Sequence, residues 1–144
     1  MENLLKDCVI TQHMNAVAAG TSTQTSAAAL DMAGYEGCIF IASLGTVTDT
    51  SALALTVLGV ATNVVSGGVA VTGAAASFTA LTSSNTMLVV DVIRPATRYL
   101  YVTLARATAN AVINCIIAIR YRARNKPVTL DATVLASALA GPIA

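Results

Sequence analysis

The apolar residues of the chain fall in short runs that are separated by turns rich in Gly, Pro, Ser and Thr. Many of these residues are β-branched, which suits the pleated surface of a sheet. Residues 38–45, CIFIASLG, form the most compact run and predict a strand buried on both faces. Residues 7–13, 52–61 and 74–81 predict further strands, and Ser66-Gly67-Gly68 predicts a tight connection. Residues 14–32 predict loop and a short strand, with a helix over 27–32 as the alternative.

Residues 87–106 predict a β-hairpin, because two apolar runs flank the turn-forming segment Arg94-Pro95-Ala96-Thr97. Pro95 is incompatible with a helix interior and presets a turn. Asp91 on the first run is expected to pair with Arg98 or Arg94 near the end of the hairpin. We interpret this segment as structural, and its proposed hairpin residues are Asp91, Arg94, Pro95, Arg98 and Tyr99.

Residues 111–122 predict the last long strand. Side chains alternate between the two faces of a strand, so its odd positions predict one apolar face. These positions are Ile113, Cys115, Ile117, Ile119 and Tyr121. If the extended conformation continues past the strand, the cations of the other parity all point the same way. They are Arg120, Arg122, Arg124 and Lys126.

Residues 127–144 hold one charge and two prolines, and they predict an extended C-terminal arm rather than a strand. The arm exposes apolar surface unless a partner receives it. Seven to nine predicted strands with regularly spaced turns indicate an all-β fold, an antiparallel β-sandwich of jelly-roll type. We therefore expect a sandwich domain over residues 1–126 and an arm over 127–144. The proposed interface combines the four cations with apolar residues of the arm, namely Pro127, Val128, Leu130, Val134, Leu135 and Leu139.

The composition changes this picture in one respect, because the surface must be unusually poor in charge. The 144 residues are 56% hydrophobic and only 10% charged, against about 25% charged in ordinary soluble domains. Such a surface is typical of a chain that a membrane or a protein partner covers. No charge occurs over residues 50–90, yet Gly, Ser and Asn interrupt this stretch too often for a membrane span. The first residues lack the apolar segment of a secretory signal, so we expect synthesis and use without export.

The few charges are unevenly distributed. Residues 1–72 hold five acidic residues and one lysine, whereas the second half holds seven cations and two acidic residues. Six of the eight cations are arginine, which is enriched at protein interfaces. Residues 120–126 could bind phosphate, but nucleic-acid binding usually brings more cations and more aromatic platforms. We therefore expect the basic run to meet acidic patches on a protein partner, with no nucleic acid as partner.

No motif for catalysis, a cofactor or a metal is present. The single histidine, His13, has no base, nucleophile or orienting acid near it in the sequence, so a structural role is expected. Cys8, Cys38 and Cys115 are widely separated and are interpreted as buried free thiols. The chain is therefore not expected to be an enzyme or to carry a cofactor.

Four phrases give the chain a family likeness. They are AVAAGT at 16–21, ALDMAGYEGCIFIASLGT at 29–46, DVIRPATRYLYV at 91–102 and ATANAVINCIIAIRYRARNKP at 107–127. On these residues the chain resembles the small capsid cement, or decoration, proteins of tailed bacteriophages, over about residues 4–127. The resemblance implies a jelly-roll sandwich without an active site. Many copies would sit on the outer face of the virion capsid, and each would tie neighbouring major capsid subunits together.

The partners expected on this basis are the major capsid protein and the chain itself, as a homodimer, with a trimer as the second choice. The protein would be made in the host cytoplasm and end on the outer surface of the capsid. The main alternative is a receptor- or carbohydrate-binding β-sandwich of the virion, which would need exposed aromatic residues. A membrane-active phage protein is disfavoured by the interrupted apolar stretch, and no membrane is expected as partner.

Overall fold

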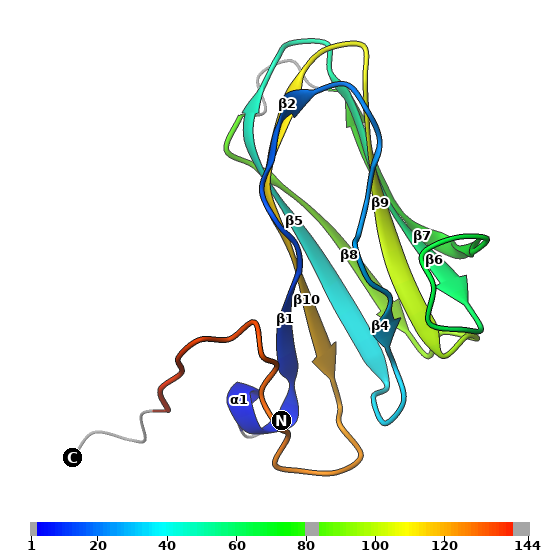
Figure 1. Cartoon of the computed structure of the whole chain (residues 1–144), viewed down its shortest axis with the longest axis vertical. Coiled ribbons are helices and arrows are strands. Elements are labelled where there is room, and N and C mark those ends of the chain that lie inside the picture. Colours follow the sequence, from blue (N-terminus) through cyan, green and yellow to red (C-terminus); the bar gives the residue numbers. More distant parts are fainter. Residues whose placement is uncertain (1–2, 80–83, 140–144) are drawn as a thin grey trace.

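The computed structural model describes residues 3–79 and 84–139 and shows an all-β sandwich of two antiparallel sheets (Figure 1). Each sheet has five strands. Sheet A consists of β1 (Val9–Met14), β2 (Val17–Gly20), β5 (Gly37–Val47), β8 (Met87–Ile93) and β10 (Ala111–Tyr121). Sheet B consists of β3 (Gln24–Thr25), β4 (Leu30–Asp31), β6 (Ala52–Val60), β7 (Val69–Thr79) and β9 (Tyr99–Ala107).

Neighbouring strands are mostly distant in sequence. Sheet A has the order β1-β10-β5-β8, and β2 pairs with β10 beyond β1. Sheet B has the order β3-β9-β6-β7, and β4 also pairs with β9. The chain therefore passes between the sheets at every connection from β4 to β10 except the one from β6 to β7. One side of the sandwich ends in β1 to β4, and the other side ends in β7 and β8.

The core lies between the sheets and is built by alternation of side chains. In β6, for example, Leu53, Leu55 and Val57 are buried while their neighbours are half-buried. Such period-two burial is the pattern of a sheet with one face against a core. The largest fully buried side chains are Phe40, Leu44, Leu55, Leu100, Leu104, Ile113 and Ile116. The predicted all-β sandwich is confirmed.

Most of the predicted strands are present, with shifted boundaries. The run at 38–45 forms the centre of β5, and 52–61 corresponds to β6. The first strand starts at Val9, because residues before it form a short helix, α1 (Leu4–Asp7), capped by the Asn3 side chain. The segment at 74–81 is not a separate strand, since β7 runs continuously through Gly73 at φ 79° to Thr79, and residues 80 and 81 lie outside the described residues. Residues 27–32 do not form the alternative helix, and within them only Leu30–Asp31 form a strand, β4.

The predicted hairpin over residues 87–106 is wrong. Both strands exist, but β8 pairs with β5 in sheet A and β9 pairs with β6 in sheet B. The segment with Arg94 at φ 49° and Pro95 therefore carries the chain from one sheet to the other. The expected pairing of Asp91 with Arg98 or Arg94 is also wrong, because Asp91 accepts a hydrogen bond from the hydroxyl of Tyr121 at 2.6 Å. Local sequence predicts strands well, but it does not say which strands pair.

The predicted single apolar face of β10 is wrong at Ile113, which is buried in the core, whereas Cys115, Ile117, Ile119 and Tyr121 do share one face. The register against β5 shifts between Ile113 and Cys115, so that Asn114 is an extra residue on β10. After this bulge, Ile116 and Ala118 face the core, and the odd positions face outward. The strand ends at Tyr121, and Arg122 has φ 51°. The four cations at 120–126 therefore do not share a direction, contrary to the prediction from parity.

Residues 127–139 form an extended segment without helix or strand, as predicted for the arm (Figure 1). Its first half lies against the body. The Val128 amide donates to the Lys6 carbonyl at 3.0 Å, and the Gln12 amide donates to the Thr133 hydroxyl at 3.0 Å. Its second half leads away from the body, and Leu135 is fully exposed. No helix in the described ranges is long and apolar enough to cross a membrane.

Candidate functional site

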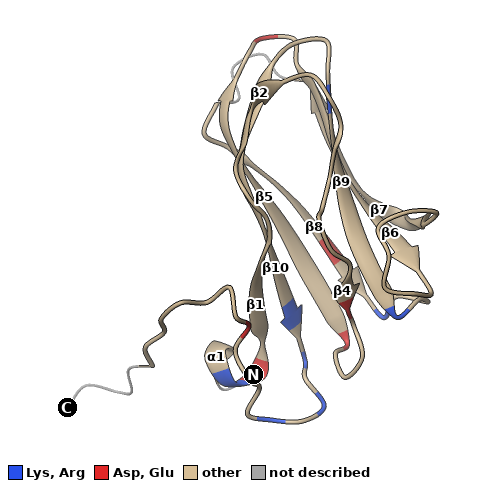
Figure 2. Ribbon diagram, in the orientation of Figure 1, with Lys and Arg blue, Asp and Glu red and all other residues tan. Residues whose placement is uncertain are grey.

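The charged side chains gather at one end of the sandwich, around the connections at 94–98 and 122–126 and the start of the chain (Figure 2). The strands between the two ends carry few charges (Figure 2). At the charged end the cations pair with acidic residues of the same chain. The pairs are Arg94 with Glu36, Arg98 with Asp31, Arg120 with Asp131, Arg122 with Glu36 and Lys126 with Asp7.

Two of the acidic residues hold exposed arginines. Glu36 lies 2.8 Å from Arg94 and 3.3 Å from Arg122, and these hydrogen bonds, that of Arg94 first, lower the pKa of its carboxyl. Asp31 accepts two hydrogen bonds from Arg98, at 3.0 and 2.9 Å. The bonds from Arg98 lower the pKa of Asp31. Both pairs are solvent-exposed, so they orient the side chains more than they stabilise the fold.

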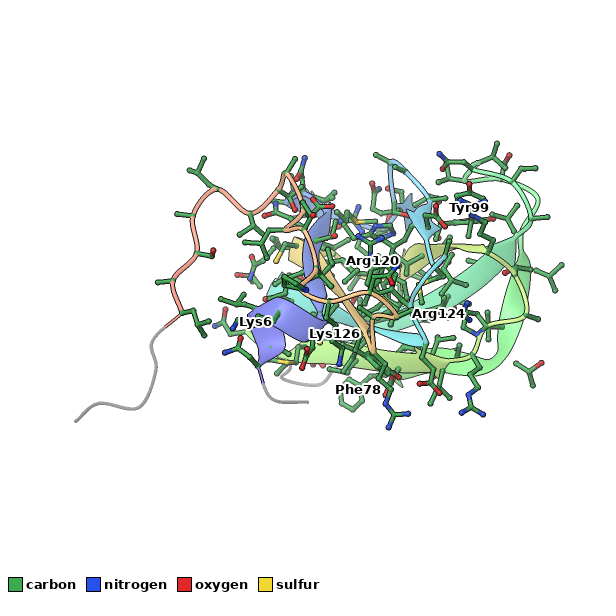
Figure 3. All side chains as sticks on the ribbon, turned by 90° about the horizontal axis from the view of Figure 1, so that it is seen from below. Lys6, Phe78, Tyr99, Arg120, Arg124 and Lys126 are labelled. Carbon is green, nitrogen blue, oxygen red and sulfur yellow. The ribbon has the colours of Figure 1, made fainter. Side chains whose placement is uncertain are left out.

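Arg120 is a structural arginine. Its guanidinium lies 4.7 Å from the centre of the Tyr35 ring and donates a 2.9 Å hydrogen bond to the Asp31 carbonyl. Its Nη2 is 4.0 Å from Asp131, so it also holds the first half of the arm. Only 14% of its side chain is exposed, and Figure 3 shows it between the sheets rather than at the rim. Arg120 thus connects segments of its own chain and is not placed to contact a partner.

The other predicted cations lie apart from Arg120. Arg122 is bound to Glu36, and Lys126 is 3.4 Å from Asp7. Arg124 is exposed and makes no ion pair within the described ranges, although its amide donates to the Gly34 carbonyl. The structure therefore does not bring the four predicted cations into one basic surface. Arg124 is the member of that set that remains free for a partner.

The outer face of sheet A is unusually apolar, and we name it the isoleucine face. Sequence analysis predicted the β10 part of this face, the odd positions from Cys115 to Tyr121, but not that it faces outward, because the β10 bulge separates it from the buried Ile113. Its rows follow from the strand register: Ile10, Ile119, Ile39 and Asp91; Gln12, Ile117, Ile41 and Val89; Cys115, Ser43 and Met87; Tyr121, Gly37 and Ile93. Solvent-facing sides of antiparallel sheets are usually polar. Here the central rows are isoleucine, and Met87, Val89 and Ile93 at the β8 side are 62%, 43% and 56% exposed.

Tyr121 ties three strands together at the end of this face. A Cβ on Gly37 would lie 2.3 Å from the tyrosine ring, so only glycine lets the ring cross β5. The Tyr121 hydroxyl then reaches Asp91 on β8. Desolvation, and next the hydrogen bond to Asp91, raise the pKa of Tyr121. The hydroxyl therefore stays protonated and keeps Asp91, the charge of this face, in place.

The outer face of sheet B has a different composition. Its central rows are Thr103, Thr56 and Ala75; Ala105, Ala54 and Ser77; Ala107, Ala52 and Thr79. The loop after β6 folds over the next row, where the Gly68 amide donates to the Tyr101 hydroxyl at 3.0 Å and Tyr101 is buried. This face thus consists of small and hydroxyl side chains and offers little apolar area to a partner.

The arm residues of the predicted interface are exposed to different degrees. Val128, Leu130 and Val134 are half-buried near the body. Pro127 is exposed, and so are Leu135 and Leu139, which are 101% and 51% exposed. Nothing within the described ranges covers Leu135. The end of the arm is therefore a second apolar surface, separate from the isoleucine face.

His13 and two of the cysteines have the structural roles expected from sequence. His13 is 9% exposed, and its ring centre is 5.6 Å from that of Phe40. Burial, and next the nearby charge of Arg120, lower the pKa of His13 to about 4. Cys8 and Cys38 are buried free thiols, whereas Cys115 is only half-buried on the isoleucine face. Within the described residues, no three His, Cys, Asp or Glu side chains are grouped to hold a metal ion.

Arg106 is a buried charge that sequence analysis did not single out. It is 3% exposed and donates to the carbonyls of Ser22, Ala18 and Ala111 at 2.9, 2.8 and 2.7 Å. Three strands or connections thus meet on one guanidinium, which satisfies a buried charge with carbonyl oxygens. The sequence did contain a sign that Arg106 is buried. It alternates in step with Leu100, Val102 and Leu104, which lie on the same face of β9 and are all buried.

The comparisons with known proteins do not extend this picture: no protein-family model matches the sequence, and no curated protein matches it.

Proposed function

We propose that this chain is a structural virion protein that binds the outer surface of a phage head and cements neighbouring major capsid subunits. The observation that carries the proposal is the isoleucine face. It presents an apolar surface on a stiff, hydrogen-bonded sheet, as a permanent protein interface requires. The resemblance of residues 4–127 to capsid cement proteins gives the partner its identity.

The isoleucine face would contribute to an interface through the apolar area that it buries. Apolar area removed from water stabilises an interface by roughly 25 cal/mol per Å². Each isoleucine of the central rows is half-buried by its neighbours, so the gain per side chain is modest. Many copies on one shell would add these modest contacts, since each linked contact raises the effective concentration of the next.

The arm provides a second point of attachment in this proposal. Its exposed leucines, Leu135 and Leu139, lie beyond the segment that Arg120 and Thr133 hold against the body. An extended apolar segment on a rigid body can reach a neighbouring subunit while the sheet face rests on another. Arg124, which makes no ion pair within the described ranges, is on the connection after β10, at the end of the sandwich from which the arm leaves (Figure 1).

We also infer that the sandwich is of jelly-roll type. If β1 and β2 count as one strand, and β3 and β4 as another, the sandwich has eight strands. Numbered along the chain, these strands have the order 1-8-3-6 in sheet A and 2-7-4-5 in sheet B. This interleaving of the chain's two halves is what two Greek keys in a double sheet produce. Jelly rolls occur in capsid and lectin domains, so this topology supports the virion proposal without selecting it over ligand binding.

The alternative, a receptor- or carbohydrate-binding sandwich, has less support. It needs exposed aromatic rings for stacking. Three of the tyrosines are engaged within the chain: Tyr35 lies under Arg120, Tyr101 binds Gly68 and Tyr121 binds Asp91. Tyr99 is half-buried beside Arg98, and Phe78 is exposed alone on β7.

The proposal can be tested by adding purified protein to heads that lack it and measuring bound copies by sedimentation. The double substitution Ile41→Lys and Ile117→Lys places two charges on adjacent positions of the isoleucine face. We expect binding to weaken at least about a hundredfold, because each buried charge would be unpaired. The matched control is Ala54→Lys with Thr56→Lys on the outer face of sheet B, which should bind as the wild type does.

Equal binding by both double variants would rule out the isoleucine face as the contact. No binding of the wild-type protein to heads, with normal binding to glycans or host cells, would favour the receptor-binding alternative. Circular dichroism of each variant would first establish that the sandwich is folded.

A further inference from the structure

Within residues 3–79 and 84–139, β8 is an edge strand of sheet A with no strand paired on its outer side. The Arg94 amide donates to the Glu36 carbonyl, and the Thr86 carbonyl accepts from the Leu44 amide. Even-numbered residues of β8 therefore turn their backbone groups toward β5, as the alternation of an antiparallel ladder requires. The amides and carbonyls of Met87, Val89, Asp91 and Ile93 must then point the other way, where β8 has no strand partner.

Proteins usually protect such an edge with a bulge, a proline, several charges or a covering segment. The opposite edge of sheet A has such protection, since the arm lies along it and Thr133 accepts from the Gln12 amide. The edge strand of sheet B, β7, is continuous, but its register against β6 shifts between Ala70 and Ala75, around Gly73 with φ 79°. By contrast, β8 has an uninterrupted register over residues 87–93, no proline and one charge. Its edge is therefore ready to add a strand.

We propose that a second copy of this chain occupies the edge, so that two β8 strands pair antiparallel across a two-fold axis and join two A sheets into one. Two-fold pairing is closed, because each copy uses the same edge. In the register centred on Val90, Met87 lies opposite Ile93 and Val89 lies opposite Asp91. All the open amides and carbonyls of both copies are then satisfied.

The sequence of β8 selects this register over its neighbours. Centring the pair on Asp91 would place two carboxylates directly opposite each other, which is unfavourable. Centring it on Val89 would leave Ile93 without a partner. In the Val90 register, each Asp91 keeps its bond to Tyr121 and faces an apolar residue, and the two carboxylates lie on a diagonal.

The surroundings of the edge add apolar contact area. Phe78 on β7 is 52% exposed, and with Met87 and Leu88 it lines a surface hollow of about 420 Å³. Figure 3 shows the Phe78 ring pointing away from the body. Backbone pairing alone covers less area than the roughly 800 Å² per partner of a standard interface. Pairing would also bring each Phe78 toward the second copy, which adds apolar contact area. The joined sheets would also present two isoleucine faces as one surface. The inference concerns self-association in solution and does not depend on binding to a shell.

The test is analytical ultracentrifugation of the full chain from low to high micromolar concentration, with three single variants. Val89→Asp sets a carboxylate opposite Asp91 of the second copy and should raise the dimer dissociation constant about tenfold or more. Val89→Lys sets an ammonium opposite the same carboxylate and should leave the constant equal or lower. Ala75→Asp, on the exposed outer side of β7, should behave as the wild type does.

Amide hydrogen exchange gives a second readout that does not depend on substitutions. The amides of Met87, Val89, Asp91 and Ile93 should exchange more slowly as the protein concentration rises, while those of β7 should not change. A strict monomer at high micromolar concentration would overturn the proposal, and would leave the edge to a strand of another protein. A dimer without slowed exchange at β8, or equal weakening by Val89→Asp and Val89→Lys, would overturn it as well.

Discussion

The two sides of the sandwich show how one chain closes one edge and leaves the other open. On the side of β1 to β4, the arm lies against β1, Arg120 binds Asp131, and Arg106 holds the carbonyls of Ser22 and Ala18. On the side of β7 and β8, Phe78, Met87 and Ile93 are more than half exposed. On the first side, buried charged residues hold segments of the same chain together. On the second side, apolar side chains remain exposed and available for contact.

The difference implies that substitutions on the closed side affect stability, whereas substitutions on the open side affect association. Buried polar groups are costly to leave unpaired, so the closed side tolerates little change. Exposed strand residues lose little when they are replaced. This contrast can be measured on single residues.

The largest effect is expected at Arg106. Replacing it with Met would leave the carbonyls of Ser22, Ala18 and Ala111 without donors and should lower the free energy of unfolding by about 4 kcal/mol. Urea denaturation followed by circular dichroism would measure the change. The matched control is Arg124→Met, at an exposed arginine, which should stay within about 0.5 kcal/mol. Equal effects of the two substitutions would contradict the conclusion that the hydrogen bonds of Arg106 stabilise the fold.

The second effect is a pH dependence from His13 on β1. Its pKa is about 4 in the folded chain and about 6.5 without burial, so the unfolded chain binds the extra proton between these values. Stability should therefore be fully present above about pH 6.5 and should fall by about 3 kcal/mol as the pH drops to about 4. The contributions of Asp31 and Glu36, whose pKa values are lowered, are lost only at lower pH.

Urea midpoints at several pH values would measure this dependence. His13→Gln should flatten the curve between pH 6.5 and 4, because glutamine does not titrate. An unchanged slope in that variant would assign the pH dependence to other groups.

The smallest effect is expected on the open side. Val89→Lys should change the free energy of unfolding of the monomer by less than about 0.5 kcal/mol, because Val89 is 43% exposed and no strand of the described residues pairs beyond β8. The measurement requires a protein concentration low enough to avoid association. A loss of several kcal/mol would show that this edge is packed by its own chain and would remove the contrast between the two sides.

The strands themselves were largely predictable, because a run such as CIFIASLG has the composition and length of a buried strand. The pairing of these strands was not, since β8 and β9 are adjacent in sequence yet belong to different sheets. The acidic partners of Arg94 and Arg98 are Glu36 and Asp31, about sixty residues away, and no local pattern indicates them. The outward direction of the isoleucine face was not predictable for a different reason, because one extra residue in β10 places Ile117 and Ile119 on the opposite face from the buried Ile113.

That extra residue, Asn114, makes the length of β10 as important as its composition. Deleting it would shift every following side chain to the opposite side of the sheet. Ile116, Ala118 and Arg120 would turn to solvent, and Ile117 and Ile119 would turn inward. The exposed residues 61–64 of the loop after β6 should tolerate insertions and deletions, whereas β10 can accept substitutions more readily than a change in its number of residues. A single-codon deletion at position 114 would exchange the inward-facing and outward-facing side chains in the rest of β10 without altering any other residue.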